Sequence, residues 1–250
     1  SICTKAETIN LICLLRKEVD KSRILDAFPI KVNGLSILIE GLVDYIFHNN
    51  FYIIGNSWGG LLAMEYALKY QANLKGLVVA NMVASIPQYV KYANGVLAPQ
   101  MPPDVLAEIR TLEANKDYSN PRYMELLIPN FYKEHICRLN EWPNGFNRAM
   151  SHVNNEIYTL MQGPSEFAAS GRLAQWDITT RLKDIAIPTL MVGAKHDTMD
   201  PKLMEQQSKL VQNGRYLYCP NGSHLAMWDD QQIFMKGVID FIHDVDEEKM

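Results

Sequence analysis

The sequence predicts an α/β protein, in which helices flank a mostly parallel sheet and a helical cap is inserted into the sheet region. The first observation behind this prediction is an apolar run at residues 51–54, which is followed by a helical pattern over residues 61–70 and a second apolar run over residues 74–80. A strand, a helix and a strand at this spacing form a parallel βαβ unit, whose strands are covered on both faces.

The second observation is a change of pattern in the middle of the chain. Runs typical of strands stop at about residue 82 and resume at residues 187–193, and helical patterns lie between them. Because the sheet pattern resumes, these helices are better interpreted as an insertion than as a separate domain. We therefore assign residues 1–81 and 177–250 to the α/β core and residues 82–176 to the helical cap.

The composition excludes several classes of function. The formal net charge is −4 at pH 7, and no Lys/Arg cluster is dense enough for a nucleic-acid surface. The 4 cysteines stand far apart without a C-x-x-C pair, which predicts neither a zinc site nor a disulfide scaffold and makes a reducing cytoplasm the expected location. No apolar run is long enough to span a bilayer and no secretory signal is recognisable, so we expect no membrane partner.

The first 50 residues carry the least distinct pattern. We expect a short helix over residues 8–19 and a hairpin over residues 30–40 that turns at Asn33-Gly34. A further helix over residues 41–48 is expected to lead into the strand at residues 51–54.

Helices are expected in the cap and alternate with strands after it. Pro103 and Asp104 have the chemistry of a helix start, and Pro129 is expected to break a longer helix. The acidic residues 244–249 are interpreted as a solvated end. The cap helices are predicted over residues 103–115, 122–139 and 147–161, and the later core elements are a strand over 187–193, a helix over 201–211, a strand over 215–219 and a helix over 231–243.

The motif Gly55-Asn56-Ser57-Trp58-Gly59-Gly60 joins the first apolar run to the first helix. A nucleophile elbow requires a buried strand, a tight turn and a helix, so that a serine Oγ stands at the carboxyl end of the strand. Glycines beside the serine leave room for this turn and tolerate unusual dihedral angles. The sequence therefore predicts Ser57 as a nucleophile.

A serine hydroxyl needs a neighbouring imidazole to accept its proton, and in open α/β sheets such groups follow the strands. His224 lies just beyond the last predicted strand, and Asp197 and Asp200 follow the strand before it. We prefer Asp197 as the orienting acid, because Asp200 stands at a helix start where an N-cap role explains it equally well. The order Ser57, Asp197, His224 is the one expected for the α/β-hydrolase arrangement.

These residues imply an acyl-transfer chemistry. His224 would take the Ser57 proton during attack on a carbonyl carbon, Asp197 would fix the tautomer of His224, and water would then cleave the covalent ester. The backbone N–H of Trp58 is expected to be one donor to the oxyanion. Because the nucleophile, base and acid are all side chains, neither a metal nor an organic cofactor is implied.

The sequence from about residue 51 to residue 243 resembles prolyl iminopeptidases of the α/β-hydrolase superfamily. The resemblance implies a serine aminopeptidase that releases N-terminal proline, or a similar small residue, from a small peptide with a free N-terminus. The stretches that carry it are residues 55–60, 161–167, 196–201 and 221–227, of which Gly163-Pro164-Ser165-Glu166-Phe167 is the most specific to the family.

By this resemblance, Glu166 is the carboxylate that binds the cationic amine of the substrate. Some relatives carry a second acid directly after the triad aspartate, where this chain has Thr198. The family also places a His-Gly-Gly-Pro-Gly-like loop, which supplies the second oxyanion donor, after an early strand. Residues 1–50 contain nothing like it. We therefore expect that the N-terminal part is shortened or altered, or that another segment replaces this loop.

Two other functions are compatible with these residues. An esterase or amide hydrolase would use the same triad on an uncharged substrate, and its turnover would be nearly unaffected by Glu166→Gln. A catalytically impaired relative that lacks the oxyanion loop would act as a binding protein or would simply be a damaged chain. Robust turnover that Ser57→Ala abolishes would exclude this second alternative.

Overall fold

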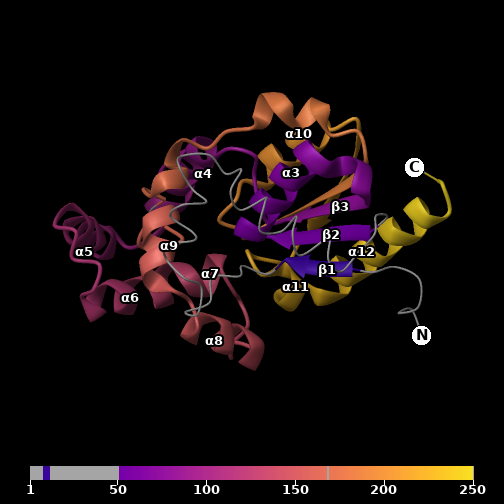
Figure 1. The fold of residues 1–250 in the computed structure, drawn as a ribbon. Helices are drawn as coiled ribbons and strands as arrows, with labels where there is room; N and C mark the ends of the chain where they lie inside the picture. Colours follow the sequence, from indigo (N-terminus) through magenta and orange to yellow (C-terminus); the bar gives the residue numbers. More distant parts are fainter. Residues whose placement is uncertain (1–7, 12–50, 168, 250) are drawn as a thin grey trace.

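The computed structural model describes residues 8–11, 51–167 and 169–249 (Figure 1). Its centre is a sheet in which every strand runs parallel to its neighbours and the strands lie in chain order. This arrangement and the helices that flank it confirm the predicted fold class. The strands are β1 (Thr8–Leu11), β2 (Phe51–Asn56), β3 (Leu74–Ala80), β4 (Pro188–Ala194) and β5 (Asn213–Cys219).

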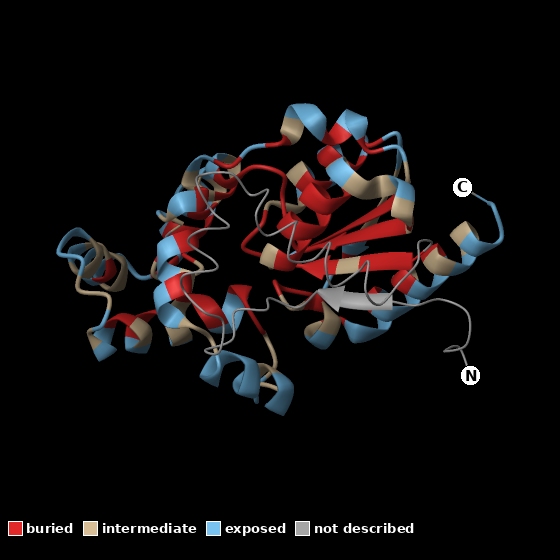
Figure 2. Ribbon diagram, viewed as in Figure 1, coloured by how far each residue is buried: buried red, intermediate tan, exposed pale blue. Residues whose placement is uncertain are grey.

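Helices cover both faces of the sheet, which explains why the central strands read as continuous apolar runs. Along β3, Leu77 and Val79 belong to the core beneath α3 (Trp58–Tyr70) and α10 (Pro201–Ser208). The alternate residues Val78 and Ala80 belong to the core beneath α12 (Gln231–Asp246). Figure 2 shows the central strands as a buried layer between helices whose outer faces are exposed.

The segment between β3 and β4 is helical and lies to one side of the sheet (Figure 1). It has an apolar core of its own, which includes Ile109, Leu127 and Phe131. The inserted cap is thus confirmed, and its boundaries at residues 82 and 176 stay a prediction. Its helices are α4 (Ile86–Tyr92), α5 (Pro103–Ala114), α6 (Pro121–Leu127), α7 (Lys133–His135), α8 (Asn144–Ser151) and α9 (Asn155–Met161).

Two predicted cap helices are interrupted. The helix expected over residues 122–139 contains a π-helical turn, Ile128–Tyr132, because Pro129 lacks the N–H that a regular turn would need. The helix expected over residues 147–161 is divided between α8 and α9, and the Asn154 side chain starts α9 by accepting a hydrogen bond from the Ile157 N–H. Sequence reasoning did not anticipate α4 or the short helix α11 (Ala226–Asp229).

The helix predicted over residues 8–19 is wrong for its first four residues. Thr8–Leu11 form β1, which pairs in parallel with β2 so that Ile9 lies opposite Ile53. The unpaired edge of β2 gives this short segment hydrogen-bond partners that a local helical pattern cannot reveal. The predictions for residues 12–50, which include the hairpin at Asn33-Gly34, lie outside the described residues.

The acidic end is not simply solvated. The last helix, α12, continues to Asp246, whose carboxylate accepts hydrogen bonds from Tyr52 Oη at 2.8 Å and Lys75 Nζ at 3.1 Å. The residues that follow α12 are exposed up to Lys249, as expected of a solvated end.

None of the helices in residues 51–167 and 169–249 has both the length and the apolar character needed to cross a membrane.

Candidate functional site

The turn between β2 and α3 holds Ser57 in a strained conformation. Its φ is 54° and its ψ is −127°, a combination that non-glycine residues adopt only where the surrounding structure enforces it. The Ser57 N–H donates to the Ala80 carbonyl oxygen at 2.9 Å, which fixes the turn to the end of β3. A Cβ atom on Gly55 would lie 2.7 Å from the Gly60 nitrogen and closer still to the Gly59 carbonyl oxygen. The turn therefore requires glycine at position 55.

The structure brings Ser57, His224 and Asp197 together from the loops that follow β2, β5 and β4. The Ser57 Oγ lies 2.7 Å from His224 Nε2, and His224 Nδ1 lies 2.8 Å from Asp197 Oδ1. His224 is 3% exposed and Asp197 is fully buried. This is the geometry in which a neutral imidazole accepts the serine proton while a carboxylate fixes its tautomer.

The electrostatics of the site favour a protonated His224. Burial alone would lower the pKa of His224, but the charge of Asp197 and its hydrogen bond to Nδ1 outweigh burial and raise that pKa above its usual value. The more distant carboxylates of Glu166 and Asp229 act in the same direction. The site is therefore built to stabilise the imidazolium that forms when the serine loses its proton.

Further residues, absent from the sequence prediction of the triad, hold Asp197. The Met199 N–H donates to Asp197 Oδ1 at 3.1 Å, and the Thr198 hydroxyl lies 3.4 Å from the same oxygen and 3.2 Å from His224 Nδ1. Asn81 Nδ2 donates to Asp197 Oδ2 at 2.7 Å. The signal for Asn81 was its position directly after an apolar run, at the same edge of the sheet as the triad residues.

Trp58 and Asp200 both stand at the start of a helix, as the sequence predicts. Trp58 is the first residue of α3, so its backbone N–H is among the helix-start donors that have no partner within the helix. Asp200 precedes α10, and its side chain accepts a hydrogen bond from the Lys202 N–H at 2.9 Å. Asp200 is therefore an N-cap, which leaves Asp197 as the acid next to His224.

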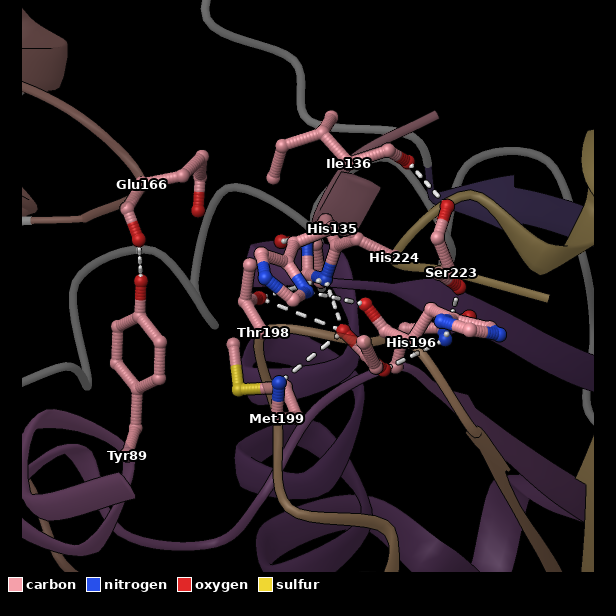
Figure 3. A network of polar contacts seen from close by, with 12 residues as sticks. Tyr89, His135, Ile136, Glu166, His196, Thr198, Met199, Ser223 and His224 are labelled. Carbon is pink, nitrogen blue, oxygen red and sulfur yellow. Dashed lines mark hydrogen bonds and ion pairs between the residues drawn. The ribbon is translucent and has the colours of Figure 1, made fainter. Parts of the chain in front are cut away.

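Glu166 lies in the cap, beyond α9, and contacts three tyrosines, of which Figure 3 shows Tyr89. Its carboxylate accepts a hydrogen bond from the Tyr158 hydroxyl, and its backbone carbonyl accepts one from the Tyr89 hydroxyl. Its N–H donates to Tyr132 Oη at 3.2 Å. Nothing in the sequence around Glu166 indicated these contacts with tyrosines.

The tyrosines around Glu166 remain protonated. Burial, together with the nearby negative charge of Glu166, raises the pKa of the Tyr89, Tyr132 and Tyr158 hydroxyls. Protonated hydroxyls of Tyr89 and Tyr158 can donate to Glu166 throughout the physiological pH range. Glu166 is thus anchored through its backbone and through one side of its carboxylate, near enough to His224 to raise the pKa of His224.

Comparison with known proteins gives related sequences and structures. Residues 41–231 match the family model described as the alpha/beta hydrolase fold. A proline iminopeptidase of Flavobacterium johnsoniae is 74% identical over 202 residues, which make up 81% of this chain and 68% of that protein. A proline iminopeptidase of Elizabethkingia meningoseptica is 71% identical over 199 residues, covering 79% of this chain and 66% of that protein.

The fold is also similar to that of a solved relative. The crystal structure of a proline iminopeptidase from Mycobacterium smegmatis superposes with a TM-score of 0.78 at 26% sequence identity, covering 89% of this chain and 76% of that chain. The chain spans about two thirds of the length of the two relatives compared by sequence.

Proposed function

Since the chain belongs to the proline iminopeptidases of the α/β-hydrolase superfamily, we propose that it is a serine aminopeptidase. Its substrate is a small peptide with a free N-terminus, from which it releases proline or a similar small residue through an acyl-enzyme. The observation that carries the proposal is the pair of distances, 2.7 Å and 2.8 Å, that link Ser57 to His224 and His224 to Asp197.

The reaction proceeds in two stages at Ser57. In the first, His224 Nε2 takes the Ser57 proton as Oγ attacks the carbonyl carbon of the N-terminal residue, and the same proton then passes to the leaving amine. Asp197 stabilises the imidazolium at Nδ1 without accepting its proton. In the second stage His224 activates a water, which hydrolyses the ester and frees Ser57. The Trp58 N–H donates to the oxyanion in both stages.

Selection for a free N-terminus is assigned to Glu166. An aminopeptidase must distinguish a cationic amine from an internal amide, and an anchored carboxylate does so by charge pairing. The Tyr158 hydroxyl occupies one side of the Glu166 carboxylate and so limits its rotation, which leaves its other acceptor sites for the substrate amine. Glu166 thereby sets the distance between the bound amine and Ser57.

The test is hydrolysis of prolyl p-nitroanilide, with and without an acetyl group on the proline nitrogen. The unmodified chain should release p-nitroaniline only from the free amine. Ser57→Ala should abolish release, because the covalent ester cannot form. Ser151→Ala, at an exposed serine of α8, should retain it. Equal rates on the free and the acetylated substrate would contradict the assignment as an aminopeptidase. Turnover that survives Ser57→Ala would contradict the assignment of Ser57 as the nucleophile.

A further inference from the structure

The end of β3 supplies none of the three triad residues, yet it contacts all three of the loops that carry them. The Ala80 carbonyl accepts the Ser57 N–H at 2.9 Å. The next residue, Asn81, uses its side-chain Nδ2 twice: it donates to Asp197 Oδ2 at 2.7 Å and to the Ser223 carbonyl oxygen at 3.1 Å. Ser223 directly precedes His224, so one amide group joins the loop of the acid to the loop of the base.

The contact with Asp197 matters because that carboxylate is fully buried. A buried charge is costly unless hydrogen bonds replace the water it has lost. Asp197 Oδ1 faces donors from His224 and Met199. Among the residues that the structure describes, Asn81 is the single hydrogen-bond donor to Asp197 Oδ2. Without it, Oδ2 loses its donor inside the protein, and only the contacts of Oδ1 fix the orientation of the carboxylate.

The backbone at Asn81 is arranged for this role. Its φ is 53°, in the left-handed region that asparagine tolerates better than most residues, and its side chain is fully buried. The Asn81 N–H donates to the Val192 carbonyl oxygen at 2.8 Å, which holds residue 81 against the end of β4. An amide also orients Asp197 without adding a charge, so it leaves intact the negative charge that stabilises protonated His224.

We propose that Asn81 is a positioning residue for the triad: it holds Asp197 Oδ1 toward His224 and ties the His224 loop to the Asp197 loop. The proposal rests on the triad roles of the proposed function. The hydrogen bonds of the Asn81 side chain go to Asp197 and to Ser223, so its effect on reactivity passes through Asp197 and His224.

The test uses two variants and a readout that does not depend on the peptide substrate. The second-order rate of Ser57 labelling by a fluorophosphonate is measured against pH for the 250-residue chain, with Ser57→Ala as the blank. Asn81→Gly accepts the same φ but lacks the amide, and should lower the labelling rate about tenfold or more at every pH. Gln207→Ala removes another buried amide, one that accepts the Ala84 N–H, and should leave the labelling profile unchanged.

The second variant, Asn81→Asp, keeps the size of the side chain and replaces the donor by a carboxyl group. The groups that already act on the His224 charge are Asp197, Glu166 and Asp229. Two buried carboxyl groups in contact share one proton, so the new carboxyl group donates to Asp197 Oδ2 as the amide does until it ionises. Labelling should therefore be kept at lower pH and lost at higher pH, where repulsion between the two carboxylates turns Asp197 away from His224. A purely structural role would lower the amount of active protein equally at all pH values and would not add this basic limb.

The outcomes separate the inference from the proposed function. If the unmodified chain is not labelled at Ser57, both the proposed function and this inference fail. If it is labelled and both folded Asn81 variants share its rate at every pH, the positioning role alone is overturned. Failure of both variants to fold beside a folded Gln207→Ala protein would also overturn it, because Asn81 would then be a folding residue.

Discussion

Replacing Glu166 by glutamine removes the charge assigned to the substrate amine while keeping the size of the side chain. Two unit charges 4 Å apart attract by about 1 kcal/mol in water and by about 4 kcal/mol at the effective dielectric constant of a protein surface region. Glu166 is half-buried, and its carboxylate already accepts one hydrogen bond from Tyr158. We therefore expect Glu166→Gln to remove about 2 to 3 kcal/mol of interaction between Glu166 and the substrate amine. This corresponds to a loss of about 30- to 150-fold in kcat/KM.

The loss should appear mainly in KM, because the amine pairs with Glu166 in the ground state as well as in the transition state. The assay compares kcat/KM for prolyl p-nitroanilide between the unmodified chain, Glu166→Gln and Glu125→Gln. Glu125 is a matched control: it lies on the cap, is exposed and makes a 3.8 Å ion pair with Arg122, so its loss changes the net charge equally. Fluorophosphonate labelling of Ser57 should be nearly unchanged in both variants.

Two results would refute this reasoning. If Glu166→Gln keeps kcat/KM within twofold of the unmodified chain, Glu166 does not bind the amine, and the esterase alternative becomes the better interpretation. If Glu166→Gln slows fluorophosphonate labelling as much as peptide turnover, Glu166 acts on the triad itself rather than on substrate binding.

Two further predictions concern the triad and the elbow. The raised pKa of His224 predicts an acid limb of kcat/KM with its midpoint above the usual histidine value of about 6.5, because activity needs the neutral imidazole. A pH profile from 5 to 9 checks this, and a midpoint at or below about 6.5 would contradict it. Gly55→Ala should destabilise the chain by about 1 to 3 kcal/mol or more, because its Cβ would meet the backbone of Gly59 and Gly60. Urea unfolding measures the loss, and Gly95→Ala, whose Cβ has nothing within 4 Å, should cost little.

Much of the fold and the relative placement of the triad could be predicted because both follow from short-range pattern. Buried parallel strands are recognisable as apolar runs, and the carboxyl ends of such strands meet at one edge of the sheet. Ser57, Asp197 and His224 each follow a strand, so their proximity followed from topology before any distance was known. The same rule applies to Asn81 at the end of β3, where no motif marked the residue for attention.

What the sequence did not reveal depends on partners far away in the chain. Thr8–Leu11 form a strand because β2, more than forty residues later, offers an open edge. Tyr89 reaches Glu166 across 77 positions, and Asn81 reaches Asp197 across 116. Hydrophobic periodicity reports only which face of an element is buried. It does not identify the polar group that a buried hydroxyl or amide will meet.

The contacts between the cap and the triad loops are polar contacts of this kind, which the sequence pattern does not reveal, and they affect function. The carbonyl oxygens of His135 and Ile136, at the end of α7, accept the N–H groups of His224 and Leu225, each at 2.9 Å. Burial lowers the pKa of His135, whose Nδ1 lies 2.9 Å from the His196 carbonyl oxygen and donates to it. Figure 3 shows His135 and Ile136 beside His196, Ser223 and His224.

The cap therefore does more than carry Glu166. Through His135 and Ile136 it holds the loops of both Asp197 and His224. Tyr132 connects this segment to Glu166, because its carbonyl oxygen accepts the Ile136 N–H and its hydroxyl oxygen accepts the Glu166 N–H. His135 lies within the helix predicted over residues 122–139, and nothing in the sequence indicates a role for it at the triad. His135 contacts the loops that carry Asp197 and His224, and its partner His196 is 61 positions away in the sequence. Its role becomes visible only when the fold brings these two loops to the same end of the sheet.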